Sequence, residues 1–411
     1  MATRDELARQ TAEAVARRSY GKLVAYLAAR TRDVSAAEEA LADAFASALT
    51  AWPGKGVPDN PEAWLMTAAA RRSIDAARRR KRGAEILAHH ALLADEMASD
   101  KPHDIPDERL ALMFACAHPA IDASVRAPLI LQTVLGFDAA TIASAFLVAP
   151  ASMSQRLVRA KGKIRGAGIP FRMPGRDELA ARLDAVLDAI YAVYAEGWNA
   201  GDAPRRNLAG EASWLGRLVV SLLPGAPEAL GLLALILHCE ARRPARRDAA
   251  GGFVPLSEQD TALWDVARIA EAENALTRAG AMDSIGRFQL EAAVQSAHNA
   301  RRLTGRTDWP AILSLYDALF GLTASPIIAI NRAVALAEVT GPQAGLAALD
   351  AQADDPRLAQ HQPYWAARAD LLARCGRTAE ADAAYGQAVG LETDAAVRGF
   401  LLARRARRAG G

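Results

Sequence analysis

The sequence predicts an all-α protein built from two or three domains. Apolar residues recur at helical spacing almost from end to end. Alanine and leucine, which favour helices, dominate the composition, and runs of β-branched residues are scarce. A chain of 411 residues is too long for one ordinary hydrophobic core. We therefore expect helical modules joined by linkers, and no sheet is needed to explain the pattern.

The first module is predicted over residues 5–82. Its central helix carries an apolar stripe made of Leu41, Phe45, Leu49 and Trp52. The acidic residues of this helix are expected to face water, namely Glu38, Glu39 and Asp43. A stretch rich in proline and glycine, residues 52–61, must end the helix. A second long helix then begins near Glu62 and runs into the basic segment 78–82.

Three further regions follow the first module. Residues 83–107 are acidic and are interpreted as a linker with room for one short helix. Residues 108–172 form a second small helical module, and residues 176–411 form a region of helix pairs punctuated by glycine and proline. Residues 325–356 match a helical repeat loosely. The last pair matches the spacing of a tetratricopeptide repeat at Trp365, Ala369, Leu372, Gly376, Ala381, Tyr385 and Ala388.

Residues 136–159 predict a helix-turn-helix motif. A short helix carrying Ile142 and Ala143 precedes a tight turn and a helix with Pro150 in its first turn, where a missing N–H costs nothing. The buried stripe of the second helix is expected to be Met153, Leu157, Ala160 and Ile164. Its outward face should carry the residues that read base edges in the major groove, which are Ser152, Gln155, Arg156 and Arg159.

Positive charge continues along the same helix at Lys161, Lys163 and Arg165. We expect Lys161 and Lys163 to contact DNA phosphates, because such contacts position a protein without specifying a sequence. The alternative is a cationic helix face that meets only solvent.

Residues 61–82 give a second signal for nucleic-acid binding. Seven basic residues lie between positions 71 and 82, against Asp75 alone. The candidate contacts are Trp64, Arg71, Arg72, Arg78 and Arg79. A charge run is usually solvated surface. Here it shares a helix with a tryptophan and a chain with a helix-turn-helix, which favours nucleic-acid binding.

The charge of the chain is uneven, although its formal net charge is only +2. Residues 1–172 hold 24 basic and 19 acidic residues, and the remainder holds 25 and 28. This modest excess suits a polyanionic partner but does not identify DNA by itself. The three cysteines lie far apart and form no disulfide or metal framework, which predicts a reduced, cytoplasmic setting. We expect neither a signal peptide nor contact with a membrane.

The two nucleic-acid signals together resemble sigma factors of the extracytoplasmic-function type. Ala63-Trp64-Leu65, with Ala69, Ile74, Asp75 and Arg78, looks like their promoter-melting region. Asp43-Ala44-Phe45 resembles the segment that grips core RNA polymerase, which implies that Asp43 and Phe45 contact the polymerase. Residues 108–165 look like the module that binds the −35 element. The resemblance implies promoter DNA and core RNA polymerase as partners, with the first module holding unpaired −10 bases.

A subgroup of these factors has a long C-terminal extension, and the resemblance to it covers nearly the whole chain. It is carried by Glu108-Arg109-Leu110, by residues 114–119, by residues 194–198 and by the repeat near the end. It implies an extension that substitutes for a separate membrane-bound anti-sigma factor. Two departures stand out. Ala70-Arg71 replaces the Arg-Asn of many relatives, which leaves the −10 preference open, and Ala149 replaces a Ser or Asp helix cap.

Other motifs are interpreted as structural. Cys116 and His118 lack the further ligands of a zinc site and are expected to serve as core and cap residues. His89 and His90 are expected in a solvated linker. For residues 196–198 we favour a helix end capped by Gly197, and the alternative is a ligand pocket.

Two rival functions remain open at this point. One is a helical-repeat adaptor that binds DNA without core polymerase. The other is an enzyme hosted by the repeat domain, which the lack of a phosphate loop, paired metal ligands or a nucleophile motif disfavours. We therefore predict no enzymatic activity and no cofactor. Because repeat solenoids bind through a concave surface, region 176–411 is expected to take a protein or peptide ligand or to contact the chain's own modules.

Overall fold

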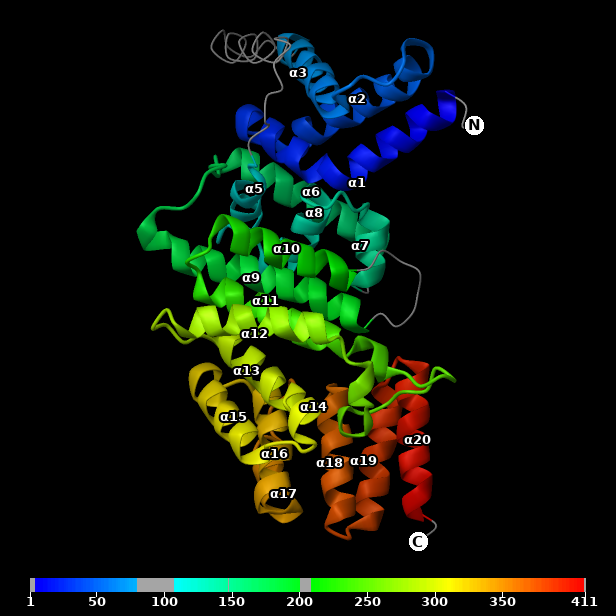
Figure 1. The fold of residues 1–411 in the computed structure, drawn as a ribbon, viewed down its shortest axis with the longest axis vertical. Helices are drawn as coiled ribbons and strands as arrows, with labels where there is room; N and C mark the ends of the chain where they lie inside the picture. The colour runs from blue at the N-terminus through cyan, green and yellow to red at the C-terminus, as the bar shows by residue number, and fades with distance from the viewer. Residues whose placement is uncertain (1–3, 80–106, 147, 200–207, 410–411) are drawn as a thin grey trace. The chain divides into compact units, whose positions relative to one another are not determined.

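The computed structural model confirms the all-α prediction (Figure 1). The structure describes residues 4–79, 107–146, 148–199 and 208–409. These residues form nineteen α-helices and three short 3-10 helices, with no strand beyond an isolated bridge between Arg247 and Phe253. The predicted linker 83–107, with His89 and His90, lies outside the described residues except at its last position. The chain divides into two compact units, Met1–Glu211 and Ala212–Gly411.

The first unit contains both predicted promoter-binding modules. Its helices are α1 Arg4–Thr31, α2 Val34–Lys55, α3 Pro61–Arg79, α5 Arg109–Cys116, α6 Ala123–Thr133, α7 Ala139–Ala145, α8 Pro150–Gly166 and α9 Arg176–Asn199. The boundary between the units falls within α10, Leu208–Leu222.

Helix α2 begins and ends where local chemistry dictates. Asp33 caps its start, because the carboxylate accepts a hydrogen bond from the Ala36 N–H at 3.2 Å. Its end is set by Gly56, which has a φ of 89° and donates its N–H to the Trp52 carbonyl at 2.9 Å. The proline- and glycine-rich stretch therefore ends the helix as predicted, although α2 runs through Pro53 to Lys55.

The apolar stripe predicted for α2 is partly wrong. Leu41 and Trp52 are buried, but Leu49 is 47% exposed and Phe45 is half-buried. The remaining core positions are Val34 and four alanines, at Ala37, Ala40, Ala44 and Ala48. Since a helix advances 3.6 residues per turn, spacings of three and four keep one face turned inward, whereas repeated steps of four drift away from it.

Helices α1 and α6 approach each other so closely that only glycine fits between them. A Cβ atom at Gly21 would lie 1.9 Å from the Val134 carbonyl oxygen, which is a backbone atom. Nearby, Gly136 has a φ of 71°, and a Cβ there would lie 2.8 Å from the Tyr20 ring. The two modules of the first unit therefore pack directly against each other.

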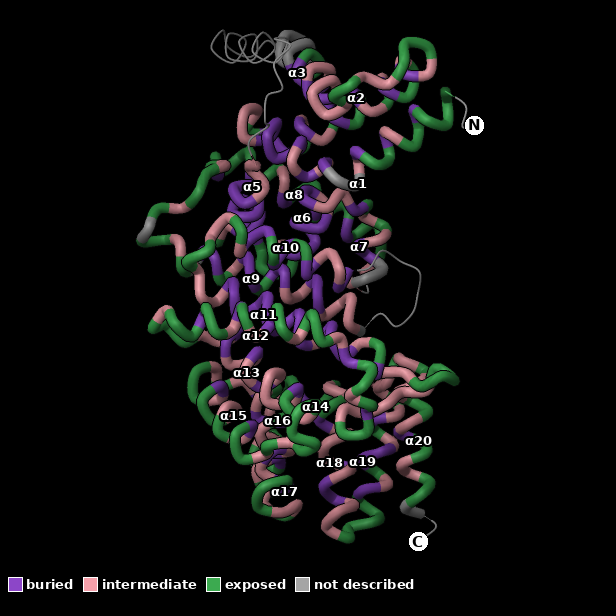
Figure 2. Tube along the Cα trace, in the orientation of Figure 1, coloured by how far each residue is buried: buried purple, intermediate pink, exposed green. Residues whose placement is uncertain are grey.

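Helix α9 lies against the helices of the second module. Helix α5 is buried from Leu110 to Cys116, as Figure 2 shows, and α9 packs against α5 and α6. The buried Arg182 of α9 donates a hydrogen bond to the Phe114 carbonyl at 2.9 Å. An orphan carbonyl near the end of α5 is thus satisfied by the first helix of the C-terminal region.

The end of α9 corrects the prediction for residues 196–198. The helix continues through Gly197 and Trp198, so Gly197 is not a helix cap. A Cβ at Gly197 would lie 2.4 Å from the Ala209 backbone nitrogen, so glycine here permits close helix packing. The Trp198 ring lies 5.8 Å from the Tyr194 ring on the same helix.

The second unit is a succession of antiparallel helices. Its α-helices after α10 are α11 Pro227–Ala241, α12 Val266–Gly280, α13 Arg287–Asn299, α14 Arg301–Thr304, α15 Trp309–Thr323, α16 Pro326–Thr340, α17 Pro342–Asp350, α18 Gln362–Arg374, α19 Thr378–Leu391 and α20 Ala395–Ala409. Three 3-10 helices separate α11 from α12, at Arg243–Arg246, Leu256–Glu258 and Thr261–Leu263.

Helix α11 is buried on almost every face and organises the start of this unit. Its Glu228 carboxylate accepts hydrogen bonds from the backbone N–H groups of Phe288 at 2.9 Å and Gln289 at 3.1 Å. A carboxylate at this position satisfies orphan donors at the start of α13. A Cβ at Gly231 would lie 2.6 Å from the Gln289 nitrogen, so α11 and α13 are in close contact.

The last helices form a separate core. The residues of the predicted repeat that are buried are Ala369, Leu372, Ala381, Tyr385 and Ala388. Trp365 packs against this core and donates its indole N–H to the Ala359 carbonyl at 3.0 Å. Turns with positive φ connect the helix pairs at Gly341 and Gly376. No described helix has the length and hydropathy needed to cross a membrane.

Candidate nucleic-acid interface

The helix-turn-helix is formed by α7 and α8, as predicted. Asp138 caps α7 by accepting hydrogen bonds from the Thr141 N–H at 2.8 Å and its hydroxyl at 2.7 Å. Helix α8 begins at Pro150, and Ala149 before it makes no side-chain cap. The start of α8 therefore lacks a side-chain cap, as expected from Ala149 in the sequence.

Helix α8 divides into an inner and an outer face. The predicted stripe is confirmed, because the buried residues are Met153, Leu157, Ala160 and Ile164. The predicted base-reading residues all lie on the exposed face, namely Ser152, Gln155, Arg156 and Arg159. Arg159 donates a hydrogen bond to the Gln155 side chain at 3.2 Å, one turn back along the helix. This face thus carries polar and cationic side chains that are exposed to solvent.

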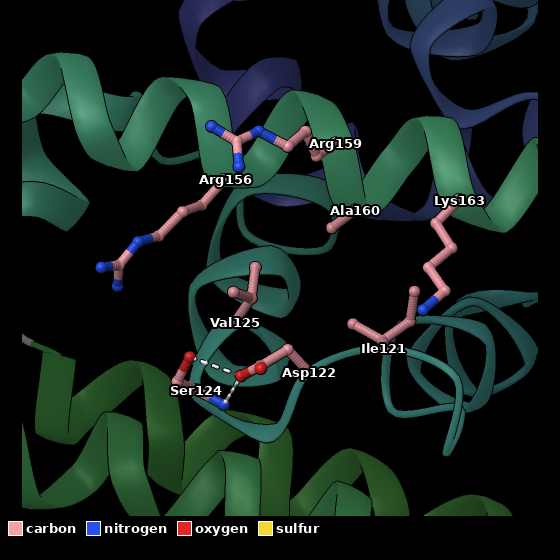
Figure 3. A pocket seen from close by; sticks show the side chains of 8 residues that line it. All are labelled: Ile121, Asp122, Ser124, Val125, Arg156, Arg159, Ala160 and Lys163. Carbon is pink, nitrogen blue, oxygen red and sulfur yellow. Dashed lines mark hydrogen bonds between the residues drawn. The ribbon is translucent and has the colours of Figure 1, made fainter.

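A cavity of about 390 Å³ lies between α8 and the start of α6 (Figure 3). Its lining residues are Ile121, Asp122, Ser124, Val125, Arg156, Arg159, Ala160 and Lys163. Figure 3 shows the basic side chains coming from α8, while Asp122 and Ser124 lie opposite on the segment that starts α6. The cavity thus continues the cationic face of α8 to the first turn of a neighbouring helix.

Asp122 is the one acidic residue that lines the cavity, which also has three basic residues in its wall. Its carboxylate accepts hydrogen bonds from the Ser124 N–H at 2.8 Å and the Ser124 hydroxyl at 2.6 Å. These bonds, with a smaller effect of Arg126 and Arg156, hold the pKa of Asp122 below its ordinary value. Asp122 is therefore ionised at neutral pH and serves as the cap of α6.

The two lysines predicted to contact phosphates differ in environment. Lys163 is exposed at the cavity. Lys161 donates to the Glu38 carboxylate of α2 at 2.7 Å, and only 10% of its side chain is exposed. A phosphate can reach Lys161 only after this pair separates. Glu38 does not face water, so that expectation is wrong, because the partner lies 123 positions away and only the tertiary structure joins the two residues.

Burial governs the titration of the groups around Glu38. Burial raises the pKa of the Glu38 carboxyl above its ordinary value, although Lys161 acts to lower it. Burial, with a smaller effect of Glu38, also raises the pKa of the Tyr20 hydroxyl. The Glu38 Oε1 atom is buried without a hydrogen-bond partner, so Lys161 binds one of the two carboxylate oxygens.

The candidate −10 residues lie on α3. The Trp64 ring meets the buried Trp52 ring edge to face, with centroids 5.5 Å apart and an angle of 68°. Arg71 and Arg72 are exposed, and Arg72 donates to the Ser47 hydroxyl of α2 at 3.3 Å. Arg78 and Arg79 belong to α3, but their side chains lie outside the described part of the structure.

The candidate polymerase contacts lie on α2. Asp43 is exposed, as predicted, and Phe45 is half-buried. The Asp43 backbone carbonyl accepts a hydrogen bond from the Ser47 hydroxyl at 2.8 Å, one turn along the same helix. Both residues can therefore contribute to a protein contact without unfolding the helix.

Cys116 and His118 occupy the structural roles expected for them. Cys116 is fully buried with its sulfur 3.4 Å from the Thr133 hydroxyl, and burial raises its pKa to about 12. His118 Nδ1 accepts a hydrogen bond from the Ala120 N–H at 3.1 Å. Within the described residues, no group of three His, Cys, Asp or Glu side chains is arranged to hold a metal ion.

Comparison with known proteins identifies part of the first module and part of the C-terminal region. Residues 15–83 match the family model described as sigma-70 region 2, which spans most of α1 with α2 and α3. Residues 182–280 match a family of unknown function, DUF6596. An uncharacterized protein of Rhizobium meliloti (strain 1021) is 37% identical over 382 residues, which cover 90% of this chain and 89% of the relative. No solved structure matches the chain.

The match to region 2 covers the candidate residues Asp43, Phe45 and Trp64 of the first module. The relative covers nearly the whole chain, so the C-terminal region is shared as well. The chain therefore belongs to one family with the Rhizobium meliloti protein, and its region 2 makes it a sigma-70 family factor.

Proposed function

We propose that this chain is a transcription initiation factor of the extracytoplasmic-function type, which binds core RNA polymerase and directs it to promoters with particular −10 and −35 elements. The observation that carries the proposal is the pairing of a sigma-70 region 2 with a helix-turn-helix in the same compact unit. The exposed polar face of α8 supports it, because this is the face from which a recognition helix reads base edges.

Each module has its own task in this proposal. Arg156 and Arg159, with Ser152 and Gln155, read the −35 element in the major groove. Trp64 and the basic residues of α3 hold unpaired −10 bases. Opening base pairs costs a few kcal/mol per base, and stacking with phosphate contacts on the open strand offsets that cost. Asp43 and Phe45 contact core polymerase. The factor acts in the cytoplasm, and it carries out no covalent chemistry of its own.

The C-terminal region supports or regulates initiation in this proposal. Arg182, in the part that matches DUF6596, binds the backbone of α5 and thereby links the extension to the −35 module. The helix pairs that end the chain have buried small residues where two helices meet, as tetratricopeptide repeats require. They offer a surface for a protein or peptide partner.

Run-off transcription with purified core RNA polymerase tests the proposal. The full chain should direct initiation at a set of promoters that core enzyme alone does not use, and Arg156→Ala should change which promoters are used. Promoter fragments bound equally well with and without polymerase, and no transcription with it, would instead identify a DNA-binding adaptor.

A further inference from the structure

Two acidic residues at the edge of α2 form ion pairs with two basic residues of the recognition helix. Basic residues at these positions are suited to contact DNA phosphates. Lys161 pairs with Glu38 at 2.7 Å, and Arg165, one turn further along α8, pairs with Asp33 at 3.2 Å. The two acids lie on the first module and the two bases on the second. The pairs therefore join α2 to α8 along one line.

The Lys161–Glu38 pair is better shielded than an ordinary surface ion pair. The exposed fractions of the two side chains are 10% and 16%, whereas Arg165 in the neighbouring pair is 52% exposed. Exposed pairs contribute little, because solvent and salt screen them, and a direct charge-assisted hydrogen bond with little water access is stronger. Of the two ion pairs, loss of Lys161–Glu38 should therefore weaken the contact between α2 and α8 more.

A second contact holds the same two modules together. Helix α1 meets α6 at Gly21, where even a methyl group would collide with the Val134 carbonyl oxygen. This contact involves no charge and lies on different helices from the ion pairs. The modules are therefore joined through two independent surfaces.

A factor bound to both promoter elements at once cannot keep this arrangement. The −35 and −10 elements are about 25 base pairs apart by their labels, which is about 85 Å along B-form DNA. Helix α8, with 17 residues, is only about 26 Å long. A recognition helix held within hydrogen-bond distance of α2 lies tens of ångströms too close to the −10 module.

We propose that the α2 edge carrying Asp33 and Glu38 is an intramolecular docking surface for the recognition helix, on which the two carboxylates occupy the places of DNA phosphates. DNA and α2 then compete for Lys161 and Arg165. The observed affinity for the −35 element equals the intrinsic affinity multiplied by the fraction of molecules that is open, so a mostly closed factor binds weakly. This inference rests on the proposed function. Because α2 also carries Asp43 and Phe45, polymerase binding acts on the same helix.

The test compares two neighbouring charge neutralisations in the full chain. Glu38→Gln removes the partner of Lys161. Glu39→Gln removes the same charge from the adjacent position, which is exposed. Binding of a fluorescently labelled −35 duplex, measured by anisotropy, should tighten roughly tenfold in Glu38→Gln, the equivalent of about 1.4 kcal/mol. Glu39→Gln should stay within about twofold of the parent chain. Equal gains in both variants would reflect bulk charge and overturn the docking surface, as would no gain in either.

A second measurement follows the contact without DNA. Gly21→Ala should force α1 and α6 apart, and hydrogen exchange should then quicken in α2 and α8 of this variant and of Glu38→Gln, but not of Glu39→Gln. Unchanged exchange together with promoter-dependent transcription would overturn the docking surface and leave the proposed function standing. Faster exchange with no −35 binding by any variant would overturn both.

Discussion

The Nζ atom of Lys161 lies 2.7 Å from the Oε2 atom of Glu38, whereas Lys163, two positions further along α8, is exposed at the cavity beside α6. Two lysines that look equivalent in the sequence therefore have different partners. Their substitution should have different effects on DNA binding.

Lys163→Met should weaken binding to all −35 duplexes by a similar factor and lower the salt dependence, because one phosphate contact with its counterion release is lost. Lys161→Met should weaken binding less, since its loss also frees α8 from Glu38. Anisotropy titrations at several salt concentrations measure both effects. A larger loss in Lys161→Met would contradict the assignment of these two residues.

Arg156→Ala should lower −35 binding in a way that depends on the DNA sequence. A lost bidentate contact to a base costs about 1–3 kcal/mol on the preferred element and much less on a variant lacking that base. Arg172→Ala is the matched control, because Arg172 is exposed outside α8. Binding assays on a panel of duplexes report the result, and an equal loss on every duplex would mean that Arg156 contacts only phosphates.

Asp43→Lys should reduce assembly with core RNA polymerase more than it reduces stability, because the Asp43 carboxylate is at the surface of α2. Asp59→Lys makes the same charge reversal at another exposed position of the module. A pull-down with core enzyme, next to thermal unfolding of each variant, separates the two effects. Full core binding by well-folded Asp43→Lys would remove Asp43 from the interface.

Tyr385→Ala should unfold the last helix pair while both promoter-binding modules stay folded. The ring is buried in the core of the final helices, and its removal should cost about 3–5 kcal/mol. Tyr385→Phe keeps the ring and should lose much less. Hydrogen exchange locates the change. If transcription is unaltered while this pair is unfolded, the repeat is dispensable for initiation.

The second unit should lose stability as the pH falls below about 6.5. Burial, with a smaller effect of Arg242, lowers the pKa of His238 to about 3, and burial with Arg242 and Arg301 lowers that of His298 to about 4. The folded state therefore keeps both rings neutral, while the unfolded chain takes up protons at the ordinary pKa of about 6.5. Each histidine should remove about 1.4 kcal/mol of stability per pH unit within this window.

His238→Asn isolates one of these two contributions. His238 Nδ1 lies 2.9 Å from the Asn299 side-chain nitrogen, and an asparagine oxygen can replace that acceptor. Because His238 is neutral at pH 7, its 3.6 Å approach to Glu273 is not an ion pair there. Unfolding of the variant between pH 7 and pH 5 should show about half the histidine-dependent slope. An unchanged slope would mean that His238 is protonated in the folded state.

The sequence by itself determined the all-α class and the buried face of α8. The spacing of Met153, Leu157, Ala160 and Ile164 identified the buried side of the recognition helix, because a helix converts spacing directly into direction. Local sequence also set helix boundaries, because Gly56 follows the end of α2 and Pro150 is the first residue of α8. Local rules of this kind need no knowledge of the rest of the chain.

Only the tertiary structure decided which helix faces meet. Four alanines, with Leu41 and Trp52, take the inner face of α2 in place of the predicted Phe45 and Leu49. Glu38 is a charged residue that the helical pattern places on the solvent side of α2, yet the fold brings it to Lys161. Gly197 has the identity of a helix cap, yet it lies within α9 where α10 approaches. These outcomes depend on contacts between distant residues, and such contacts leave no periodic signal in the chain.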